Sequence, residues 1–333
     1  MIKRACIDFK KFYTAFFIKC GGDSMSYEKN FAKKILNRED INPTHITRAN
    51  TSGQKKVFFI KVDGEEYVFK MVNITPVEID DEFEENVDFS DEIKREKQLI
   101  VNEKTERIKK ELQMAKNVSI LPQLKLIDQY KIYVDDDEYY LYYIEEKFKG
   151  VPLSDLYKKA TFTIDQVISF IEQLVKSIEL MYNCKYIHRD IKPLNIIVND
   201  GIYKLIDGGL CKYLEDEINL TMTPDFIGTY RYSAPEQEKR SSNYNWDFTT
   251  DLYPVGLIAI ELFIPKAREY SEEHLKDLEY IYSKWKSEDI KANLLFSKVI
   301  SRLSSPNKAK RFNNFNEIYL LLDKIKDVGS DSL

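Results

Sequence analysis

The chain has 333 residues, 43% of them apolar and 32% charged, which is typical of a folded protein long enough for two packed lobes. Its net charge of −5 supplies no global basic field, so we expect no nucleic-acid partner. No apolar run approaches the length of a membrane-spanning helix, so we expect no membrane span. The four cysteines lack disulfide-framework or metal-ligand spacing, which favours reduced thiols in a cytoplasmic protein.

Residues 1–45 precede the first clear strand pattern and mix aromatic residues with lysines. One interpretation is a short extension that packs on a neighbouring lobe. The other is an arm that binds a regulatory partner.

The pattern of residues 46–72 predicts β-strands. Residues 57–62 are rich in β-forming side chains, and Asp63-Gly64 is a hairpin signal. The return strand covers residues 67–70 and ends in a lysine, Lys70. Acidic residues then dominate positions 78–92 without a basic one, which is typical of a solvated loop.

The rest of the chain alternates helical and strand patterns. A long helix is expected from about residue 90 to residue 116, with Ser90 as its N-cap, and a buried strand at 139–144. A second helix covers residues 163–183, where apolar residues recur at helical spacing. Strands at 196–198 and 203–206 form a hairpin, and an apolar segment at 255–263 predicts a buried helix.

Between the second helix and the hairpin lies His188-Arg189-Asp190, followed after four residues by Asn195; Asp207 comes directly after the hairpin. Together these side chains can supply one proton acceptor and two metal ligands, which phosphoryl transfer from ATP requires. The motif matches the catalytic loop of protein kinases residue for residue. From about residue 46 to about residue 325 the chain resembles the eukaryotic-like (Hanks-type) Ser/Thr protein kinases.

The resemblance implies an α+β, bilobal protein-kinase-like fold. Residues 1–45 would form an N-terminal extension. Residues 46–147 would form a small β-rich N-lobe with one regulatory helix. Residues 148–328 would form a larger, mainly helical C-lobe, and residues 329–333 a tail.

The resemblance also assigns roles in catalysis. Asp190 would accept the proton of the substrate hydroxyl, and Lys192 would neutralise the transferring phosphoryl group. Asn195 and Asp207 would hold Mg²⁺, with Mn²⁺ as an alternative metal. Thr229 would bridge Asp190 and Lys192, and this Lys/Thr pair resembles Ser/Thr-specific kinases.

Further residues would bind ATP. Lys70 would anchor the α- and β-phosphates and be oriented by Glu96 of the long helix, with Glu103 as the second choice. The resemblance implies three apolar residues against the adenine, one glycine in the nucleotide loop and one hinge residue: Val57, Val68, Ile197, Gly53 and Glu146.

Residues 228–236 resemble the end of a protein-kinase activation segment, which kinases of small molecules generally lack, so they argue for a protein substrate. In this family Glu236 would pair with Arg311, and Asp251 would accept hydrogen bonds from the catalytic-loop backbone. Thr221 and Thr223 are the candidate sites of activating autophosphorylation, since Arg189 could pair with a phosphate.

Two departures from the family pattern keep other functions open. The nucleotide loop at 49–57 has one glycine, Gly53, where the family has three, and Gly208 replaces the large apolar residue that follows the metal-binding Asp207. The alternatives are a pseudokinase that binds or scaffolds a partner, and a small-molecule kinase.

Overall fold

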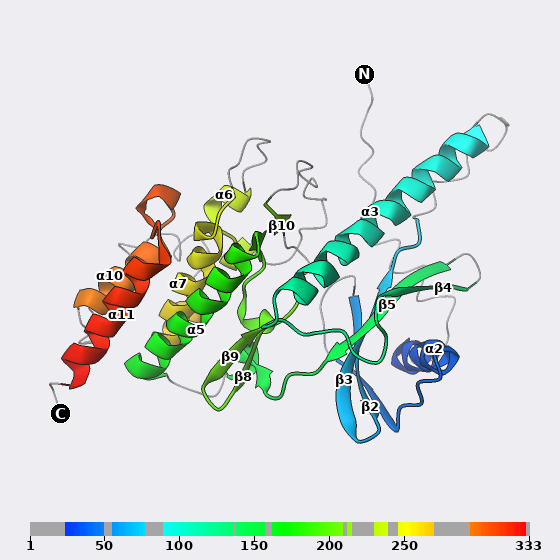
Figure 1. The fold of residues 1–333 in the computed structure, drawn as a ribbon, viewed down its shortest axis with the longest axis horizontal. Helices are drawn as coiled ribbons and strands as arrows, with labels where there is room; N and C mark the ends of the chain where they lie inside the picture. The colour runs from blue at the N-terminus through cyan, green and yellow to red at the C-terminus, as the bar shows by residue number, and fades with distance from the viewer. Residues whose placement is uncertain are drawn as a thin grey trace. The chain divides into compact units, whose positions relative to one another are not determined.

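The computed structural model describes residues 24–49, 55–76, 89–135, 138–156, 162–208, 212–214, 230–238, 246–269 and 294–330 (Figure 1). The chain divides into two compact units, Met1–Thr105 with Leu124–Lys147, and Glu106–Gln123 with Phe148–Leu333. The division after Lys147 falls at the predicted lobe boundary. Residues 106–123, which the sequence assigns to the N-lobe, group instead with the second unit.

The first unit contains a five-stranded antiparallel sheet with the strand order β1-β2-β3-β5-β4. The predicted hairpin is confirmed: Asp63 and Gly64 have positive φ angles of 50° and 87°, as a tight turn between β2 and β3 requires. The strands are β1 (His45–Arg48), β2 (Lys55–Val62), β3 (Glu65–Asn73), β4 (Lys131–Asp135) and β5 (Glu138–Glu146).

One face of this sheet is covered by helix α2 (Ser24–Arg38). Ala32, Ile35 and Leu36 are fully buried there, and the ring of Phe31 meets that of Tyr140 at a centroid distance of 4.8 Å. The helix supplies apolar side chains at helical spacing to strands whose inward residues alternate. This part of the predicted N-terminal extension is therefore built into the core of the first unit.

Two glutamates fasten α2 to the strands. Glu28 pairs with Arg48 Nε of β1 at 2.8 Å and with Lys56 Nζ of β2 at 3.1 Å, so one carboxylate bridges two strands. Just beyond the helix, Glu39 pairs with Lys131 and accepts a hydrogen bond from the Tyr142 hydroxyl. Burial raises the pKa of Tyr142, and this hydrogen bond raises it further.

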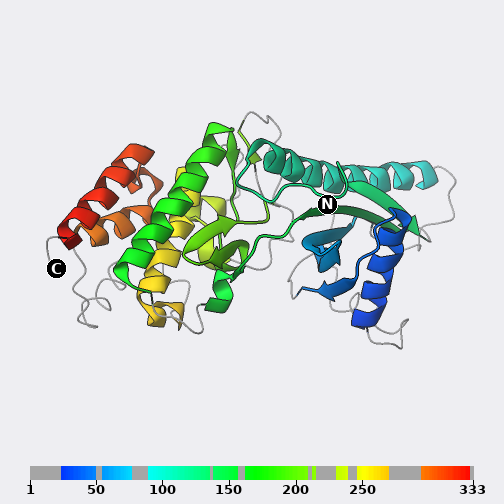
Figure 2. The ribbon, with the colours of Figure 1, turned by 60° about the horizontal axis from the view of Figure 1, so that its bottom comes forward.

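Helix α3 (Phe89–Asn117) is the predicted long helix. Its start differs slightly from the prediction, because Ser90, expected as the N-cap, lies inside the helix. In Figures 1 and 2 the sheet lies between α2 and the first part of α3. Lys104 Nζ donates to the carbonyl of Thr75, just after β3, whereas Met114 near the C-terminus is buried in the core of the second unit.

The described residues of the second unit include the longer helices α5 (Ile164–Asn183), α7 (Thr249–Phe263), α10 (Leu294–Leu303) and α11 (Phe315–Ser330). Helix α5 begins with a capping box: Thr163 Oγ1 accepts from the Gln166 backbone N–H, while the Gln166 side chain accepts from Thr163 N–H. Helix α7 is buried along nearly its whole length, as predicted. It approaches α10 closely at Gly256, where a Cβ would lie 2.5 Å from Ser304 N.

Small sheets and short helices are also found in the described part of this unit. Strands β6 (Val151–Pro152), β8 (Ile196–Asn199) and β9 (Ile202–Leu205) form one sheet, and β7 (Tyr186–Ile187) pairs with β10 (Lys212–Tyr213). The predicted β8–β9 hairpin is confirmed. The short helices are α4 (Leu153–Leu156), α6 (Pro235–Glu238), η1 (Pro193–Asn195), η2 (Tyr230–Tyr232), η3 (Pro265–Glu269) and η4 (Lys308–Lys310).

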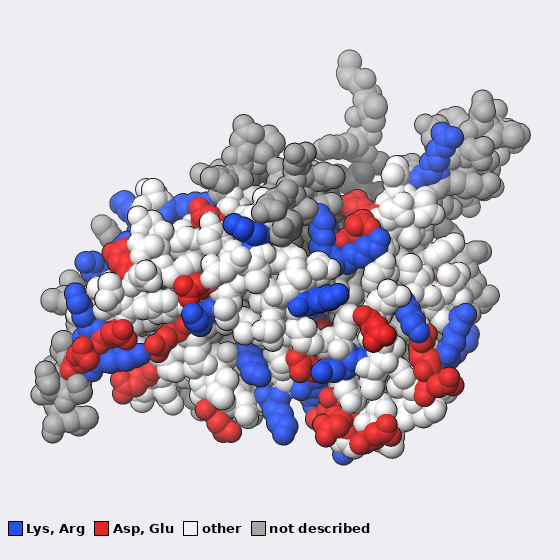
Figure 3. All heavy atoms as spheres, viewed as in Figure 1, with Lys and Arg blue, Asp and Glu red and all other residues white. Residues whose placement is uncertain are grey.

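A β-sheet unit followed by a mainly helical unit confirms the predicted α+β class. Among the described helices, none has both the length and the apolar character to cross a membrane. Basic and acidic side chains are interspersed over the face drawn in Figure 3.

Replacing Ile35 by alanine tests the structural role of α2. The side chain is fully buried against the sheet, so Ile35→Ala should lower the free energy of unfolding by about 2–5 kcal/mol. Urea denaturation followed by circular dichroism measures the change. Lys33→Ala, on the exposed side of the same helix, is the matched control and should change stability by no more than about 0.5 kcal/mol. Equal stabilities of the two variants would contradict the packing described.

Candidate active site

The loop that carries His188, Arg189 and Asp190 is held by a buried carboxylate. Asp251, in the first turn of α7, is 1% exposed and accepts hydrogen bonds from the backbone N–H groups of His188 and Arg189, each at 2.8 Å. Burial raises the pKa of Asp251, while His188 and the two N–H groups oppose the rise. The predicted contact between Asp251 and the loop backbone is confirmed.

Arg189 has a left-handed backbone, with φ of 65°, which a non-glycine residue adopts only under restraint. Hydrogen bonds to both the backbone N–H and the backbone carbonyl of Arg189 provide this restraint. Asp251 accepts from its N–H, and Gln237 Nε2 donates to its carbonyl at 2.9 Å. The guanidinium lies 4.8 Å from the ring centroid of Trp246. Helices α6 and α7 therefore fix the loop conformation.

The Asp190 carboxylate is held by two side chains of its own loop. Lys192 Nζ lies 3.0 Å from Oδ1 and 2.9 Å from Oδ2. Asn195 Nδ2 donates to Asp190 Oδ2 and to the Asp190 carbonyl, both at 2.9 Å. The side chains of Asp190 and Lys192 each retain 19% of their exposure, so both remain within reach of a substrate.

Asn195 and Asp207 emerge at the same end of the β8–β9 hairpin. Ile196 lies opposite Leu205, and the ladder continues with the Ile206 N–H donating to the Asn195 carbonyl at 2.9 Å. Asp207 follows at once, with a left-handed φ of 60°. Because Asn195 directs its amide nitrogen toward Asp190, its amide oxygen is the atom left to act as a metal ligand.

These two residues fit a hard divalent cation. One amide oxygen and one carboxylate are oxygen donors, and Mg²⁺ commonly takes only one or two protein ligands while keeping waters and substrate phosphates. Within the described ranges, no group of three or more His, Cys, Asp or Glu residues could hold a metal ion. Gly208, the departure noted after Asp207, is buried.

Three of the predicted nucleotide-binding residues lie on one face of the first unit's sheet: Val57, Val68 and Lys70. Val57 of β2 lies opposite Lys70 of β3, which lies opposite Tyr143 of β5; Val68 lies opposite Glu145. Since side chains alternate along a strand, this face is the one turned away from α2. Val57, Val68 and Lys70 are thus brought together by strand register.

Lys70 has a carboxylate partner that the sequence analysis missed. Its Nζ lies 2.7 Å from Glu145 Oε1, with 6% and 10% of the two side chains exposed. The predicted partner, Glu96, is a residue of α3, but its side chain lies outside the described part of the structure. The second choice, Glu103, is exposed on α3. The alternation of side chains along β5 could have identified Glu145, because it places Glu145 on the same face as Tyr143, which lies opposite Lys70.

The remaining predicted residues are placed as follows. Ile197 lies in β8, opposite Pro152 and Lys204. Glu146 ends β5 opposite Tyr67, so its side chain takes the other face from Lys70. The predictions for four residues fall outside the described ranges: Gly53, Thr221, Thr223 and Thr229.

A buried ion pair secures the segment that begins at Tyr230. Arg311 Nη1 and Nη2 contact the two carboxylate oxygens of Glu236 at 2.6 and 2.9 Å, which confirms the predicted pair. Arg311 also donates to the carbonyls of Thr249 and Ser305. Such a bidentate contact fixes the orientation of the guanidinium relative to the carboxylate as well as the distance between them.

A second buried carboxylate, Glu261 in the last turn of α7, holds the same segment. It accepts from Arg231 Nε and from the Tyr232 hydroxyl, each at 2.8 Å. Burial raises the pKa of Glu261, with Arg231 opposing, and burial also raises the pKa of Tyr232. Arg231 further donates to the Ala267 carbonyl. Buried side chains on α7 and beyond it thus hold residues 231–237 in one position.

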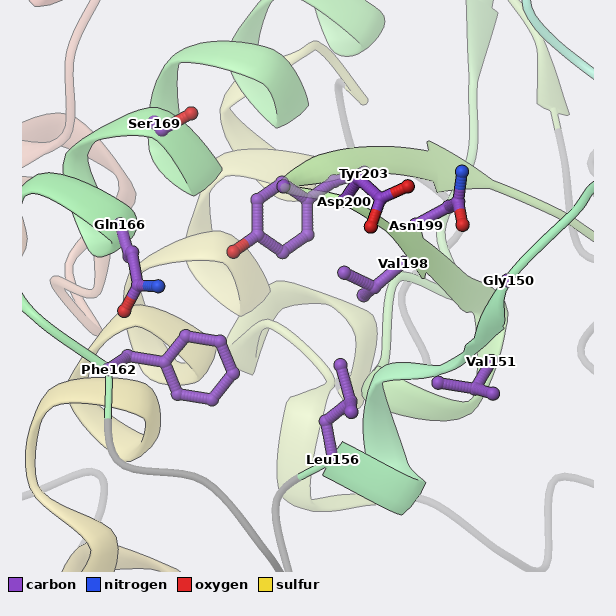
Figure 4. Close-up of a pocket in the computed structure, with 11 residues that line it drawn as sticks. Gly150, Val151, Leu156, Phe162, Gln166, Ser169, Val198, Asn199, Asp200 and Tyr203 are labelled. Carbon is purple, nitrogen blue, oxygen red and sulfur yellow. The ribbon is translucent and has the colours of Figure 1, made fainter.

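A separate cavity of about 420 Å³ lies within the second unit (Figure 4). It is bounded by β6, α4, the start of α5 and the β8–β9 hairpin, and it contains none of the predicted site residues. Gly150 is required beside it, because at φ of 125° a Cβ would lie 2.3 Å from the Val198 carbonyl oxygen. Polar and apolar side chains both line it, among them Phe162, Gln166, Ser169, Val198, Asp200 and Tyr203.

Comparison with known families agrees with this geometry. Residues 91–317, well over half of the chain, match the protein kinase domain family. The chain therefore belongs to the protein kinase domain family, and its two-unit architecture is the bilobal kinase fold. The resemblance inferred from the catalytic-loop motif is confirmed.

Curated relatives include bacterial and plant kinases. Serine/threonine-protein kinase D of Synechocystis sp. is 28% identical over 241 residues, which cover 69% of this chain and 45% of that protein. A probable serine/threonine-protein kinase of Clostridium perfringens is 30% identical over 174 residues, 52% of this chain and 23% of that protein. Mitogen-activated protein kinase kinase kinase 1b of Physcomitrium patens is 34% identical over 129 residues, 38% of this chain and 16% of that protein. The chain thus spans less than half the length of these relatives.

The buried Glu236–Arg311 pair provides a stability test. Glu236→Gln leaves Arg311 buried without a counter-charge and should destabilise the second unit by about 3–5 kcal/mol, as measured by urea denaturation. Glu172→Gln is the matched control, because Glu172 pairs with Lys326 at 2.8 Å with both side chains about 40% exposed. Removal of that surface pair should cost less than about 1 kcal/mol. Similar losses in both variants would contradict the anchoring role.

Proposed function

We propose that this protein is an ATP-dependent protein kinase that transfers the γ-phosphoryl group of ATP to Ser or Thr hydroxyls of a protein substrate, with autophosphorylation. The observation that carries the proposal is the Asp190–Lys192–Asn195 network, in which one carboxylate is held by an ammonium and an amide. The Ser/Thr preference draws on the names of the bacterial relatives and on Lys192 and Thr229, which resemble the pair of Ser/Thr-specific kinases.

Asp190 would act as the proton acceptor. A general base must lie within hydrogen-bond reach of the substrate proton and be held in the right orientation. Asn195 donates to Asp190 Oδ2, and Lys192 contacts both carboxylate oxygens, so the orientation is defined before substrate arrives. The ammonium of Lys192 is also positioned to offset the negative charge of a phosphoryl group arriving beside Asp190.

Asn195 and Asp207 would hold Mg²⁺, and Mn²⁺ could take its place. When bound, the cation offsets the charge on the ATP phosphates. The hairpin contributes by presenting the two oxygen ligands from one rigid end, since the Ile206-to-Asn195 hydrogen bond continues the strand ladder up to Asp207.

Lys70 would anchor the α- and β-phosphates, and Val57 and Val68 would contact the adenine from the same face of the sheet. Ile197 would add an apolar contact from β8, while the hinge near Glu146 would offer backbone groups. Gly53 would let the nucleotide loop approach the phosphates closely. Phosphoryl transfer depends mostly on such positioning and on charge stabilisation, which suits the groups present.

A protein substrate is favoured by the anchored segment at residues 231–237. Arg311 and Glu261 hold this segment against α7, as a platform for a polypeptide requires. The proposed partners are therefore ATP and a protein with a Ser or Thr acceptor. Residues 1–23, Thr221 and Thr223 remain candidates for a regulatory contact and for autophosphorylation.

The central test is radiolabelled-ATP transfer to a generic basic protein in Mg²⁺. Asp190→Asn should lower the rate by about 10²–10⁴-fold, because it removes the proton acceptor while preserving the shape of the side chain. Asp200→Asn is the matched control: it makes the same change in the hairpin turn, where Asp200 has φ of 49°, which asparagine tolerates, and should leave the rate unchanged.

Each other result would contradict the proposal in a distinct way. If wild type and Asp190→Asn are equally silent toward the protein and toward themselves, the chain is a pseudokinase with a binding or scaffolding role. If phosphate passes only to a metabolite, the chain is a small-molecule kinase. Equal activity of the two proteins would remove Asp190 from the mechanism.

Metal dependence tests Asp207 separately. A fluorescent ATP analogue should bind wild type more tightly as Mg²⁺ or Mn²⁺ is added. Asp207→Asn should reduce that metal-dependent gain in affinity about tenfold or more, because loss of a ligand weakens the metal site. A gain equal to that of wild type would exclude Asp207 as a ligand.

A further inference from the structure

We infer that Glu145 is a positioning residue for Lys70, a carboxylate that holds the phosphate-anchoring lysine from within the β-sheet. The inference rests on the proposed role of Lys70 in binding ATP. It adds a residue that the sequence analysis did not select and that acts alongside any contact from α3. The observation that carries it is the 2.7 Å distance between Lys70 Nζ and Glu145 Oε1.

Strand register makes this contact inherent to the sheet. In the antiparallel β3–β5 pair, Lys70 lies opposite Tyr143 and Val68 lies opposite Glu145. Lys70 and Glu145 are therefore diagonal neighbours on one face, a separation that two long side chains can span. The Lys70 ammonium also lies 5.8 Å from the centroid of the Tyr143 ring, so the face of β5 offers two contacts to the cation.

Burial gives the pair its significance. Only 10% of the Glu145 side chain is exposed, and a carboxylate removed from water is strongly destabilising unless it is paired. The Lys70 side chain is 6% exposed, and its buried ammonium likewise requires an opposite charge. Each side chain thus supplies the counter-charge that the other requires, and solvent screens the pair far less than a surface pair.

The position of Glu145 in the sheet is fixed on both sides. Strand β5 pairs with β3 along residues 67–73, and Glu145 is also bridged by Leu124 on its other edge. An ammonium has three N–H donors, so Lys70 can keep Glu145 as an acceptor while donating to a phosphate oxygen. Glu145 therefore gives Lys70 a counter-charge and a fixed direction that do not depend on where α3 lies.

The test compares Glu145→Gln with wild type in ATP kinetics. Glutamine preserves shape but removes the charge, so kcat/KM for ATP should fall about 10–100-fold, because the ammonium loses the counter-charge that directs it. Glu66→Gln is the matched control, because Glu66 of β3 pairs with Lys147 at 2.9 Å but is 59% exposed. That variant should retain the kcat/KM of wild type.

A second readout follows Lys70 itself. Acetic anhydride modifies neutral amines, and mass spectrometry reports the extent of acetylation at each lysine. Lys70 should react faster in Glu145→Gln than in wild type, while Glu145→Asp, which keeps the charge, should stay close to wild type. This readout needs no catalytic activity, and it separates lost positioning from mere destabilisation, which would raise the reactivity of neighbouring lysines such as Lys56 as well.

Lys70→Met separates failure of the inference from failure of the proposed function. If Lys70→Met is as active as wild type, the phosphate-anchoring role of Lys70 is wrong. If Lys70→Met is inactive while Glu145→Gln keeps the kcat/KM and the Lys70 acetylation rate of wild type, the inference about Glu145 is overturned. In a double-mutant cycle with Glu96→Gln, a residual effect of Glu145→Gln when Glu96 is absent would support an independent contribution.

Discussion

Helix α7 organises the second unit because it carries two buried carboxylates in an otherwise apolar helix. Asp251 in its first turn orients the backbone of the loop that ends in Asp190, and Glu261 in its last turn holds Arg231 and Tyr232. A buried charge must be satisfied by donors, so each carboxylate compels a surrounding segment to adopt one conformation. The left-handed backbone at Arg189 persists for this reason.

The same logic appears in the sheet of the first unit, where the buried charges belong to Lys70 and Glu145. One face of that sheet is apolar and covered by α2, whereas the other carries the charged pair together with Val57 and Val68. One face of the sheet therefore packs in the core, and the other carries the side chains proposed to bind ATP. Such a division follows from side-chain alternation along each strand.

Local sequence signals predicted most of the elements. Asp63-Gly64 marked a hairpin because few residues accept positive φ, and apolar residues at helical spacing marked α5. The catalytic-loop motif identified Asp190, Lys192 and Asn195, which the structure brings into mutual contact. The hairpin and helix predictions succeeded because their determinants lie within a few residues of one another.

Contacts between distant segments were harder to predict. Glu145 was missed because its partner, Lys70, is 75 residues away and only the strand register brings them together. Helix α2 was left between two interpretations because its apolar stripe is satisfied by strands far along the chain. Residues 106–123 group with the second unit rather than with the predicted N-lobe, and one continuous helical pattern gives no sign that the unit changes along the helix.

The bridge made by Glu28 extends the influence of α2 beyond packing. Its carboxylate pairs with Arg48 of β1 and Lys56 of β2, the two strands joined by residues 49–54, which are part of the proposed nucleotide loop at 49–57. A fragment cut to the conventional catalytic core at residue 46 would lose this tie and uncover the apolar face around Phe58, Phe69 and Tyr142. The helix ahead of the first strand is thus part of the core of the first unit, although it lies outside the motifs proposed for catalysis.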